Sequence, residues 1–214
     1  MSIREFVENM GSDNLEVVGG KFEGGYRLQQ IVDEIVPCVE YLVSLNRKWR
    51  NFLEIGSAAG GSAYLFQHYL KFENMVLIDN NQYLNKIKQP DLRTKNLKGL
   101  SYIEIIGNSR SPAVCGKFLK LNMTFDFMII DGDHRLAQVN RDVEIYSPFL
   151  ENGGYLMVHD IVACPGVKAI FMQMCNNKEY SLIKEYISTE HPRPCGIGLF
   201  KKKEDRGSGC EMMW

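Results

Sequence analysis

The chain has 214 residues, of which 45% are hydrophobic and 24% are charged, and this composition excludes a largely disordered or collagen-like protein. Its 25 basic and 26 acidic side chains give a net charge of -1, so no basic excess favours binding to nucleic acid. No segment approaches the roughly 20 consecutive apolar residues of a membrane helix, and the early acidic residues of the amino terminus do not suit a secretory signal.

The first predicted elements are an amino-terminal arm and a helix. Residues 1–25 contain two Gly-Gly pairs, so we predict a loose arm there, either an ordinary extension or a lid over a site. From Tyr26 to Val43 apolar residues recur at steps of three and four, which predicts an amphipathic helix. Pro37 lies inside this pattern and predicts that the helix is kinked or split.

Short apolar runs then alternate with helical patterns along the rest of the chain. The predicted strands are 52–55, 75–78, 102–106, 125–130, 155–158, 182–187 and 197–201. The predicted helices are 62–71, a segment that begins at Pro112, 136–150 and 165–175. The segment 151–154 predicts a turn before the fifth strand, and residues 204–214 predict a polar tail.

This alternation indicates an α/β fold with a mainly parallel, doubly wound, Rossmann-like sheet that carries helices on both faces. We predict one such domain over residues 26–203, between the arm and the tail. In these sheets ligands bind at the carboxyl ends of the strands. The polar residues that directly follow predicted strands are therefore the candidates for a functional site.

A glycine-rich loop follows the first strand, where residues Glu54 to Ser62 read EIGSAAGGS. Small residues let the backbone approach a ligand, and the helix that follows presents free N–H groups. The spacing of Gly56, Ala58 and Gly60 departs from the G-x-G-x-x-G pattern of dinucleotide-binding folds. Loops of this kind also serve as plain strand-to-helix connections, so the loop alone leaves both interpretations open.

Asp79 closes the second predicted strand, 23 residues after Gly56. A carboxylate at this separation can accept hydrogen bonds from the two hydroxyls of a ribose, as in nucleotide-binding units. The alternative is a turn-forming aspartate before Asn80 and Asn81. The glycine loop upstream favours the ribose.

Asp131, Asp133 and His134 form a second cluster, after the fourth strand. Two carboxylates and an imidazole within four residues suit proton transfer or metal binding. Asp160 ends the next strand and would lie beside Asp131 if the two strands are adjacent. For Asp133 the alternative is capping of the following helix, and for His134 it is an ordinary exposed position.

Together these segments resemble the class I S-adenosylmethionine-dependent methyltransferases. The resemblance rests on LEIGSAAGGS from residue 53, IDN from 78, GNS from 107, FDFMIIDGDH from 125 and GGYLMVHD from 153. Within the class, the chain most resembles the branch of cephalosporin-hydroxylase-like proteins and macrocin-type sugar O-methyltransferases, over residues 22–201. The combination of IDGDH with the later GGY and HD is the specific part of the pattern.

The resemblance implies seven strands, the last antiparallel, with S-adenosylmethionine laid across the carboxyl edge of the sheet. Glu54 and the glycine loop would hold its methionine part, and Asp79 its ribose. Asn108 and Ser109 would flank the adenine, and Asp131 would face the sulfonium and the substrate. The implied cofactor-binding residues are Glu54, Gly56, Ser57, Ala58, Gly60, Ser62, Asp79, Asn80, Asn108, Ser109 and Asp131.

Some positions depart from the family's pattern. Ala58 stands where many relatives have glycine, and Asn108 where many have aspartate. Metal-dependent O-methyltransferases of this kind place one carboxylate after the fourth strand, here Asp131, and an Asp-Asp or Asp-Asn pair after the fifth. That pair reads His159-Asp160 in this chain. Mg²⁺ prefers oxygen ligands, so Asp131 and Asp160 are its candidate ligands, and the need for a metal stays open.

The leading hypothesis is an enzyme that moves the methyl group of S-adenosylmethionine to a hydroxyl oxygen of a small molecule or sugar. Its catalytic candidates are Asp131, Asp133 and His134, one of which would take the proton of the acceptor. Two alternatives stay open, a nicotinamide-dependent oxidoreductase and a cofactor-binding subunit without turnover.

The sequence also predicts the surroundings of the protein. Six cysteines without a C-x-x-C pair are interpreted as reduced thiols of a cytoplasmic protein. We expect a small-molecule or sugar acceptor and no nucleic-acid or membrane partner, and the chain could form a homo-oligomer.

Overall fold

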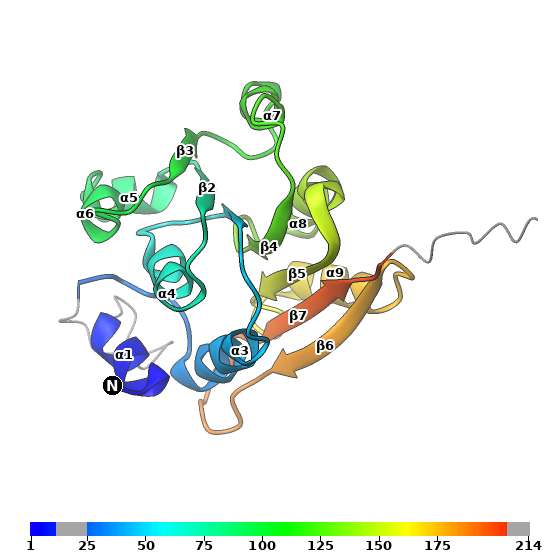
Figure 1. Ribbon diagram of the computed structural model, residues 1–214, viewed down its shortest axis with the longest axis horizontal. Helices are drawn as coiled ribbons and strands as arrows, with labels where there is room; N and C mark the ends of the chain where they lie inside the picture. Colours follow the sequence, from blue (N-terminus) through cyan, green and yellow to red (C-terminus); the bar gives the residue numbers. More distant parts are fainter. Residues whose placement is uncertain (12–24, 205–214) are drawn as a thin grey trace, which may run out of the picture.

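The computed structural model describes residues 1–11 and 25–204, and within them seven strands form one sheet (Figure 1). The strands are β1 (Asn51–Ile55), β2 (Asn74–Asp79), β3 (Ile103–Ile106), β4 (Phe125–Ile130), β5 (Leu150–His159), β6 (Tyr180–Tyr186) and β7 (Ile197–Lys202). Their order across the sheet is β3-β2-β1-β4-β5-β7-β6. Strands β1 to β5 pair in parallel, and β7 is antiparallel to both β5 and β6. The predicted fold class is confirmed, with the antiparallel last strand between β5 and β6.

Helices cover both faces of this sheet. They are α1 (Ile3–Met10), α3 (Val32–Ser44), α4 (Gly61–Leu70), α5 (Gln82–Lys86), α6 (Leu92–Asn96), α7 (Pro112–Leu119), α8 (Leu136–Tyr146), the 3-10 turn η2 (Ser147–Phe149) and α9 (Pro165–Cys175). Helices α1, α3 and α4 lie on one side, and α7, α8 and α9 on the other (Figure 1).

Alternate side chains of each strand build two separate cores, because successive residues of a strand point to opposite faces. In β1, Phe52 packs with the α3 and α4 side, whereas Leu53 packs with the α7 to α9 side. All six residues of β4 are buried, as expected for a central parallel strand covered on both faces. The carboxyl ends of β1, β2, β4 and β5 therefore meet at one edge of a rigid sheet.

The first described helices differ from the prediction. Helix α1 was not expected, although Ser2 and Glu5 form a capping box that the sequence displays, and its Val7 and Met10 are buried in the core. Helix α3 begins at Val32 rather than Tyr26, and it is not split at Pro37. The proline forfeits one hydrogen bond near the start of the helix, while the buried face of the helix keeps its packing.

Other differences concern the middle of the chain. The short helices α5 and α6 were not predicted, because five residues are too few to display a helical period. The predicted turn at 151–154 is part of β5, which is paired with β4 through a register shift between Phe125 and Phe127. Residues 12–24 of the predicted arm and residues 205–214 of the predicted tail, with Cys210, lie outside the described residues.

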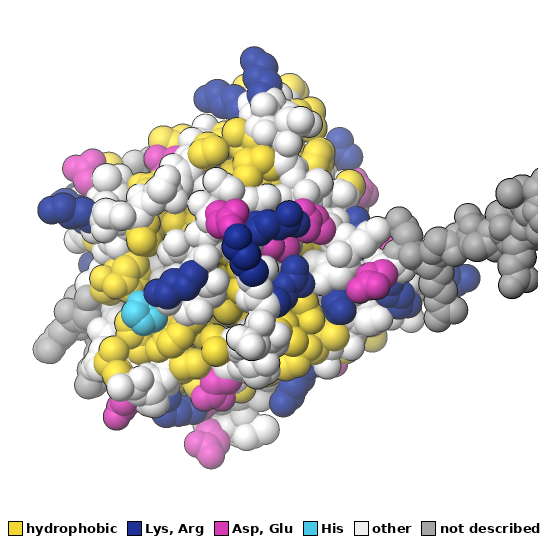
Figure 2. All heavy atoms as spheres, in the orientation of Figure 1, with side chains coloured by type: hydrophobic (Ala, Val, Ile, Leu, Met, Phe, Trp, Pro, Cys, Tyr) yellow, Lys and Arg dark blue, Asp and Glu magenta, His cyan; other side chains and the backbone are white. Residues whose placement is uncertain are grey.

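Charges of both signs are mixed on the surface. Figure 2 shows Lys and Arg side chains lying beside Asp and Glu side chains on the face in view, with apolar areas between them. Within residues 1–11 and 25–204, none of the helices combines the length and the apolar character that a membrane span needs. The five described cysteines are free thiols.

Candidate active site

A cavity of about 880 Å³ opens along the carboxyl ends of β1 to β5. The predicted cofactor residues that line it are Gly56, Ser57, Ala58, Ser62, Asp79, Asn80, Asn108, Ser109 and Asp131. The predicted catalytic and metal residues Asp131, Asp133, His134 and Asp160 line it as well. Glu54 and Gly60 belong to the same loop region but do not line the cavity. One cleft therefore gathers residues from the ends of five strands, β1 to β5, as expected for a ligand site in an α/β sheet.

Gly56 makes the closest approach between two of these strand ends. Its φ of +89° lies in the left-handed region, and its N–H donates to the Ile78 carbonyl at 2.8 Å. A Cβ atom at Gly56 would lie 2.0 Å from the carbonyl oxygen of Asp131. Only glycine fits this contact. The glycine loop is thus fixed against the strand end that carries Asp131.

Ala58, where many relatives have glycine, also adopts a left-handed conformation, with a φ of +42°. An L-residue other than glycine is strained there by about 1–2 kcal/mol. Two hydrogen bonds hold the residue in place, since its N–H donates to Asp79 Oδ2 at 2.9 Å and its carbonyl accepts from Arg93 Nε at 2.8 Å.

Asp79, the predicted ribose ligand, contacts three donors. Its Oδ1 accepts the backbone N–H of Asn81 at 2.6 Å and lies 3.0 Å from Nη2 of Arg93. Its Oδ2 accepts the backbone N–H of Ala58 at 2.9 Å. A carboxylate offers about four lone-pair positions. The two backbone N–H groups occupy one on each oxygen, and the Arg93 ion pair lies against Oδ1, so Oδ2 keeps an open position for a ligand.

Arg93 is a site residue that the sequence did not reveal. It comes from α6, is only 1% exposed, and reaches beneath the glycine loop to contact Asp79, Glu104 and the Ala58 carbonyl. A buried guanidinium is stable only when it is paired and hydrogen-bonded. No local sequence signal marks it, because its helix is short and its neighbours are ordinary surface residues.

Glu54 lies behind the loop as a buried carboxyl group. It accepts a hydrogen bond from the Ser62 hydroxyl on Oε1, while Oε2 makes none with the described residues. Burial is the main reason that the pKa of Glu54 is raised to about 8. A positively charged ligand group nearby would favour its ionised form.

The predicted adenine end is tied to a buried network. The Ser109 hydroxyl donates to Asp142 at 2.6 Å, and Arg110 Nη1 lies 3.1 Å from the same carboxylate. The backbone N–H of Arg110 donates to Oδ1 of Asn108 at 3.1 Å. The Ser109 hydroxyl thus serves the fold, and Asn108 is positioned through its oxygen.

Asp133 is held by arginines. Its carboxylate contacts Nη2 of Arg135 at 2.6 Å and Nη2 of Arg110 at 3.4 Å, and it accepts the backbone N–H of Arg135 directly before α8. The hydrogen bond from Arg135 is the main reason that the pKa of Asp133 is lowered to about 2. A carboxylate held in this way is a weak base at neutral pH.

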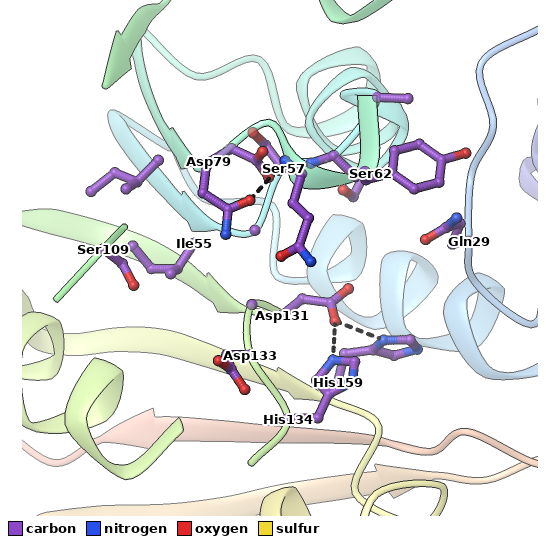
Figure 3. Close-up of a pocket in the computed structure, with 18 of the residues that line it drawn as sticks. Gln29, Ile55, Ser57, Ser62, Asp79, Ser109, Asp131, Asp133, His134 and His159 are labelled. Carbon is purple, nitrogen blue, oxygen red and sulfur yellow. Dashed lines mark hydrogen bonds and ion pairs between the residues drawn. The ribbon is translucent and has the colours of Figure 1, made fainter. Parts of the chain in front are cut away.

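Two carboxylates and two imidazoles lie close together on the side of the cavity opposite Asp79. Nε2 of His134 lies 3.4 Å from Asp131 Oδ1 and 3.2 Å from Asp160 Oδ2. Nδ1 of His159 lies 3.2 Å and 3.6 Å from the same two oxygens. Figure 3 shows Asp131 pointing toward both imidazoles, across the cavity from Asp79 and Ser57. The parallel register pairs Ile130 of β4 with Val158 of β5, so Asp131 lies beside His159, and Asp160 follows one residue later.

These four groups perturb one another's protonation. Burial alone would raise the pKa of Asp131, but His159 and His134 hold it below its usual range. The hydrogen bond with Asp131 raises the pKa of His134. Burial alone would lower the pKa of His159, but the carboxylates Asp131 and Asp160 outweigh it and raise the pKa to about 9.

Sequence reasoning named His159 only as the neighbour of Asp160. The residue ends β5 in the same way that Asp131 follows β4, and this position was the signal that could have identified it. Gln30, also not predicted, donates from Nε2 to Asp131 Oδ2 at 3.2 Å and comes from the segment before α3. Cys195 lines the same end of the cavity.

The donor set suits Mg²⁺ poorly. Mg²⁺ takes oxygen ligands in octahedral geometry, whereas Asp131 Oδ1 and Asp160 Oδ2 each face two imidazole nitrogens.

A family model described as "Methyltransferase domain" matches residues 53–161, just over half of the chain. Among curated proteins, the chain is similar to a rhamnosyl O-methyltransferase of Mycobacterium leprae, with 29% identity over 115 residues that cover 50% of this chain and 47% of that protein. The chain spans about half the length of the curated relatives it matches.

Solved structures share the fold. A Klebsiella pneumoniae protein provisionally assigned as an O-methyltransferase matches with a TM-score of 0.62 and 14% identity, over 94% of this chain and 90% of that chain. The O-methyltransferase TomG of Streptomyces achromogenes, solved in complex with SAM, matches with a TM-score of 0.55 and 14% identity, over 79% and 81%.

Proposed function

The chain belongs to the family of methyltransferase domains, and we propose that it transfers the methyl group of S-adenosylmethionine to a hydroxyl oxygen of a small molecule or sugar. The observation that carries this proposal is one cavity whose lining includes Asp79 as well as the group formed by Asp131, His134, His159 and Asp160. One end offers an acceptor for a ribose hydroxyl, and the other offers groups that can take a proton.

The cofactor would lie across the glycine loop. Asp79 holds a ribose hydroxyl, and Asn108 and Ser109 flank the adenine. At the other end, the loop beside Ser57 faces the methionine part, and Glu54 lies behind this loop, where the nearby ammonium group would favour its ionised form. The sulfonium then lies near Asp131. The bound cofactor SAM in TomG supports this choice of cofactor.

The reaction is an in-line displacement at the methyl carbon. The new carbon–oxygen bond forms as the carbon–sulfur bond breaks, and the sulfonium becomes a neutral thioether. The acceptor hydroxyl also loses its proton, because an alcohol is too weak an acid to ionise near neutral pH. His134 takes this proton, with Asp131 as the carboxylate that orients its imidazole; the side chain of His134 is 39% exposed and lies at the edge of the cavity.

We assign Asp133 to positioning rather than proton transfer. Its two arginine contacts lower its pKa to about 2 and leave little basicity at neutral pH. The carboxylate instead connects the loop after β4 to Arg110, which in turn contacts the buried Asp142.

A sugar or another hydroxylated small molecule is the proposed acceptor. The name of the Mycobacterium leprae relative supports a sugar, and the polar rim of the cavity, with Gln30, His134 and Arg135, suits hydroxyl groups. A homo-oligomeric state and a cytoplasmic location stay predictions of the sequence.

The direct test supplies isotopically labelled S-adenosylmethionine and a panel of sugars and other hydroxylated compounds to the full chain. Labelled product that disappears in Asp131→Asn supports the proposal. Calorimetry with S-adenosylhomocysteine and with NAD separates a methyltransferase from a nicotinamide-dependent oxidoreductase. Tight binding of NAD without binding of S-adenosylhomocysteine contradicts a methyltransferase. Binding of S-adenosylhomocysteine with no product from any acceptor class favours a subunit without turnover.

A further inference from the structure

Helix α6 supports the glycine loop through two side chains. Nε of Arg93 donates to the carbonyl of Ala58 at 2.8 Å, and Nδ2 of Asn96 donates to the carbonyl of Ala59 at 2.8 Å. Arg93 and Asn96 are three positions apart in the helix and therefore share one of its faces. A Cβ atom at Gly60 would lie 3.1 Å from Cγ of Arg93. The helix thus lies against three consecutive residues of the loop.

Each nitrogen of the Arg93 guanidinium faces a different partner. Nε donates to the Ala58 carbonyl, Nη1 donates to Glu104 of β3, and Nη2 lies 3.0 Å from Oδ1 of Asp79. The side chain is 1% exposed. A planar guanidinium of fixed geometry can serve three acceptors at once, whereas the compact ammonium of a lysine cannot. Arg93 therefore fixes the loop relative to both Asp79 and β3.

Ala58 is the residue of the loop that needs this support. Its φ of +42° lies in the left-handed region, where an alanine is strained and a glycine is not. Ala59, the next residue, lies outside that region. Both backbone groups of Ala58 are hydrogen-bonded, the N–H to Asp79 Oδ2 and the carbonyl to Arg93. These two bonds compensate the strain.

The position of Ala58 also affects the proposed ribose ligand. Ala58 and Asp79 both line the cavity, whereas Arg93 does not. The N–H of Ala58 occupies one acceptor position of Oδ2, the oxygen of Asp79 that keeps an open position for a ligand. A shift of Ala58 would therefore move the partner that orients this oxygen. Arg93 can act on a bound cofactor only through these two residues.

We infer that Arg93 is a positioning residue for the cofactor, and that its hydrogen bond to the Ala58 carbonyl lets an alanine occupy a turn that glycine would adopt without strain. This inference rests on the proposed function, because it concerns the ribose end of the same site. It makes Arg93 and Ala58 a coupled pair. The hydrogen bond matters for cofactor affinity while residue 58 is alanine, and much less once residue 58 is glycine.

The test measures the affinity for S-adenosylhomocysteine by calorimetry in the wild type, Arg93→Lys, Ala58→Gly and the double variant. Arg93→Lys keeps a positive charge beside Asp79 but loses the guanidinium donor to Ala58, and it should bind at least about 10-fold more weakly than the wild type. In the Ala58→Gly background the same substitution should cost about threefold or less, because glycine takes a positive φ without strain.

Two controls isolate this coupling. Ala59→Gly adds backbone freedom one residue later, and it should not reduce the loss caused by Arg93→Lys, as a general loosening of the loop would. Lys95→Gln changes an exposed cation of the same helix and should bind like the wild type. Urea denaturation checks that each variant is folded. If Arg93→Lys does not fold, Glu104→Gln removes one partner of the guanidinium at a partly exposed position and should show the same dependence on residue 58.

Equal losses from Arg93→Lys with alanine and with glycine at position 58 overturn the inference and leave the proposed function intact. The same holds if Arg93→Lys binds as tightly as the wild type, or if Ala59→Gly reduces the loss as much as Ala58→Gly does. A folded wild type without affinity for S-adenosylhomocysteine overturns the proposed function as well as the inference.

Discussion

The guanidinium of Arg93 lies 3.0 Å from the carboxylate of Asp79, and both side chains are buried beneath the glycine loop. The N–H groups of Asn81 and Ala58 each occupy one of the about four acceptor positions of Asp79, and the Arg93 ion pair lies against the same oxygen, Oδ1, as the Asn81 N–H. The ribose ligand expected from the sequence is therefore already part of a structural network, and this limits how it can bind a cofactor.

The first prediction is that Asp79 holds one ribose hydroxyl rather than two. Of 2′-deoxy- and 3′-deoxy-S-adenosylhomocysteine, one should bind about 10- to 100-fold more weakly than the parent, since it loses a hydrogen bond to a charged group. The other should bind nearly as well as the parent. Calorimetry measures the three affinities, and Asp79→Asn should reduce the difference between the analogues. Equal losses for both analogues would show that the carboxylate contacts both hydroxyls.

The second prediction is that Gly56→Ala destabilises the fold. The new Cβ would lie 2.0 Å from the Asp131 carbonyl oxygen, and φ is +89°. Strain and overlap together should lower the free energy of unfolding by about 2–4 kcal/mol. Urea denaturation measures it. Gly116→Ala in α7, where a Cβ meets nothing within 4 Å, is the matched control and should be neutral or slightly stabilising. Equal stability of the two variants contradicts the close approach.

The third prediction concerns Glu54 and pH. Its pKa is about 8 in the folded protein and 4.5 ordinarily, so between these values the folded state holds a proton that the unfolded state has lost. This group's contribution to stability therefore falls as the pH rises from about 4.5 to 8. Glu54→Gln should remove that decline, and its advantage over the wild type should grow with pH. Urea denaturation across this range measures both proteins, and parallel profiles would contradict the raised pKa.

The fourth prediction separates the two aspartates of the loop after β4. Asp131→Asn should lower the rate of methyl transfer by about 100-fold or more, because it removes the carboxylate that orients the proton acceptor His134, and a lost general base costs this much. Asp133→Asn, only two residues away, should lower it less than tenfold, because Asp133 is held by Arg135 and Arg110. Initial rates at saturating S-adenosylmethionine test this pair. A larger loss in Asp133→Asn would move the proton transfer to Asp133.

The sequence predicted those parts of the fold that local patterns encode. Apolar runs such as Phe125–Ile130, broken only by Asp126, predicted the buried parallel strands, and the helix at Pro165–Cys175 was predicted with the observed bounds. The predictions missed elements whose signals are short or overridden by packing. Helix α6 has only five residues, and α3 continues through Pro37 because its apolar face is buried.

The candidate site also contains residues that the sequence predicted and residues that only the structure revealed. The strand ends can be read from the chain, so Asp79, Asp131 and Asp160 could be named and placed at one edge of the sheet before the structure was known. Which groups surround them depends on crossings between elements far apart in sequence. Arg93 reaches Asp79 from a helix that carries no pattern, and His159 meets Asp131 only because β4 and β5 are adjacent. Periodicity and spacing thus determine which end of a strand carries a polar residue. Distances of about 3 Å between side chains arise only from tertiary packing. Here the packing decided that Arg93 lies against the carboxylate of Asp79 and that His159 lies against Asp131.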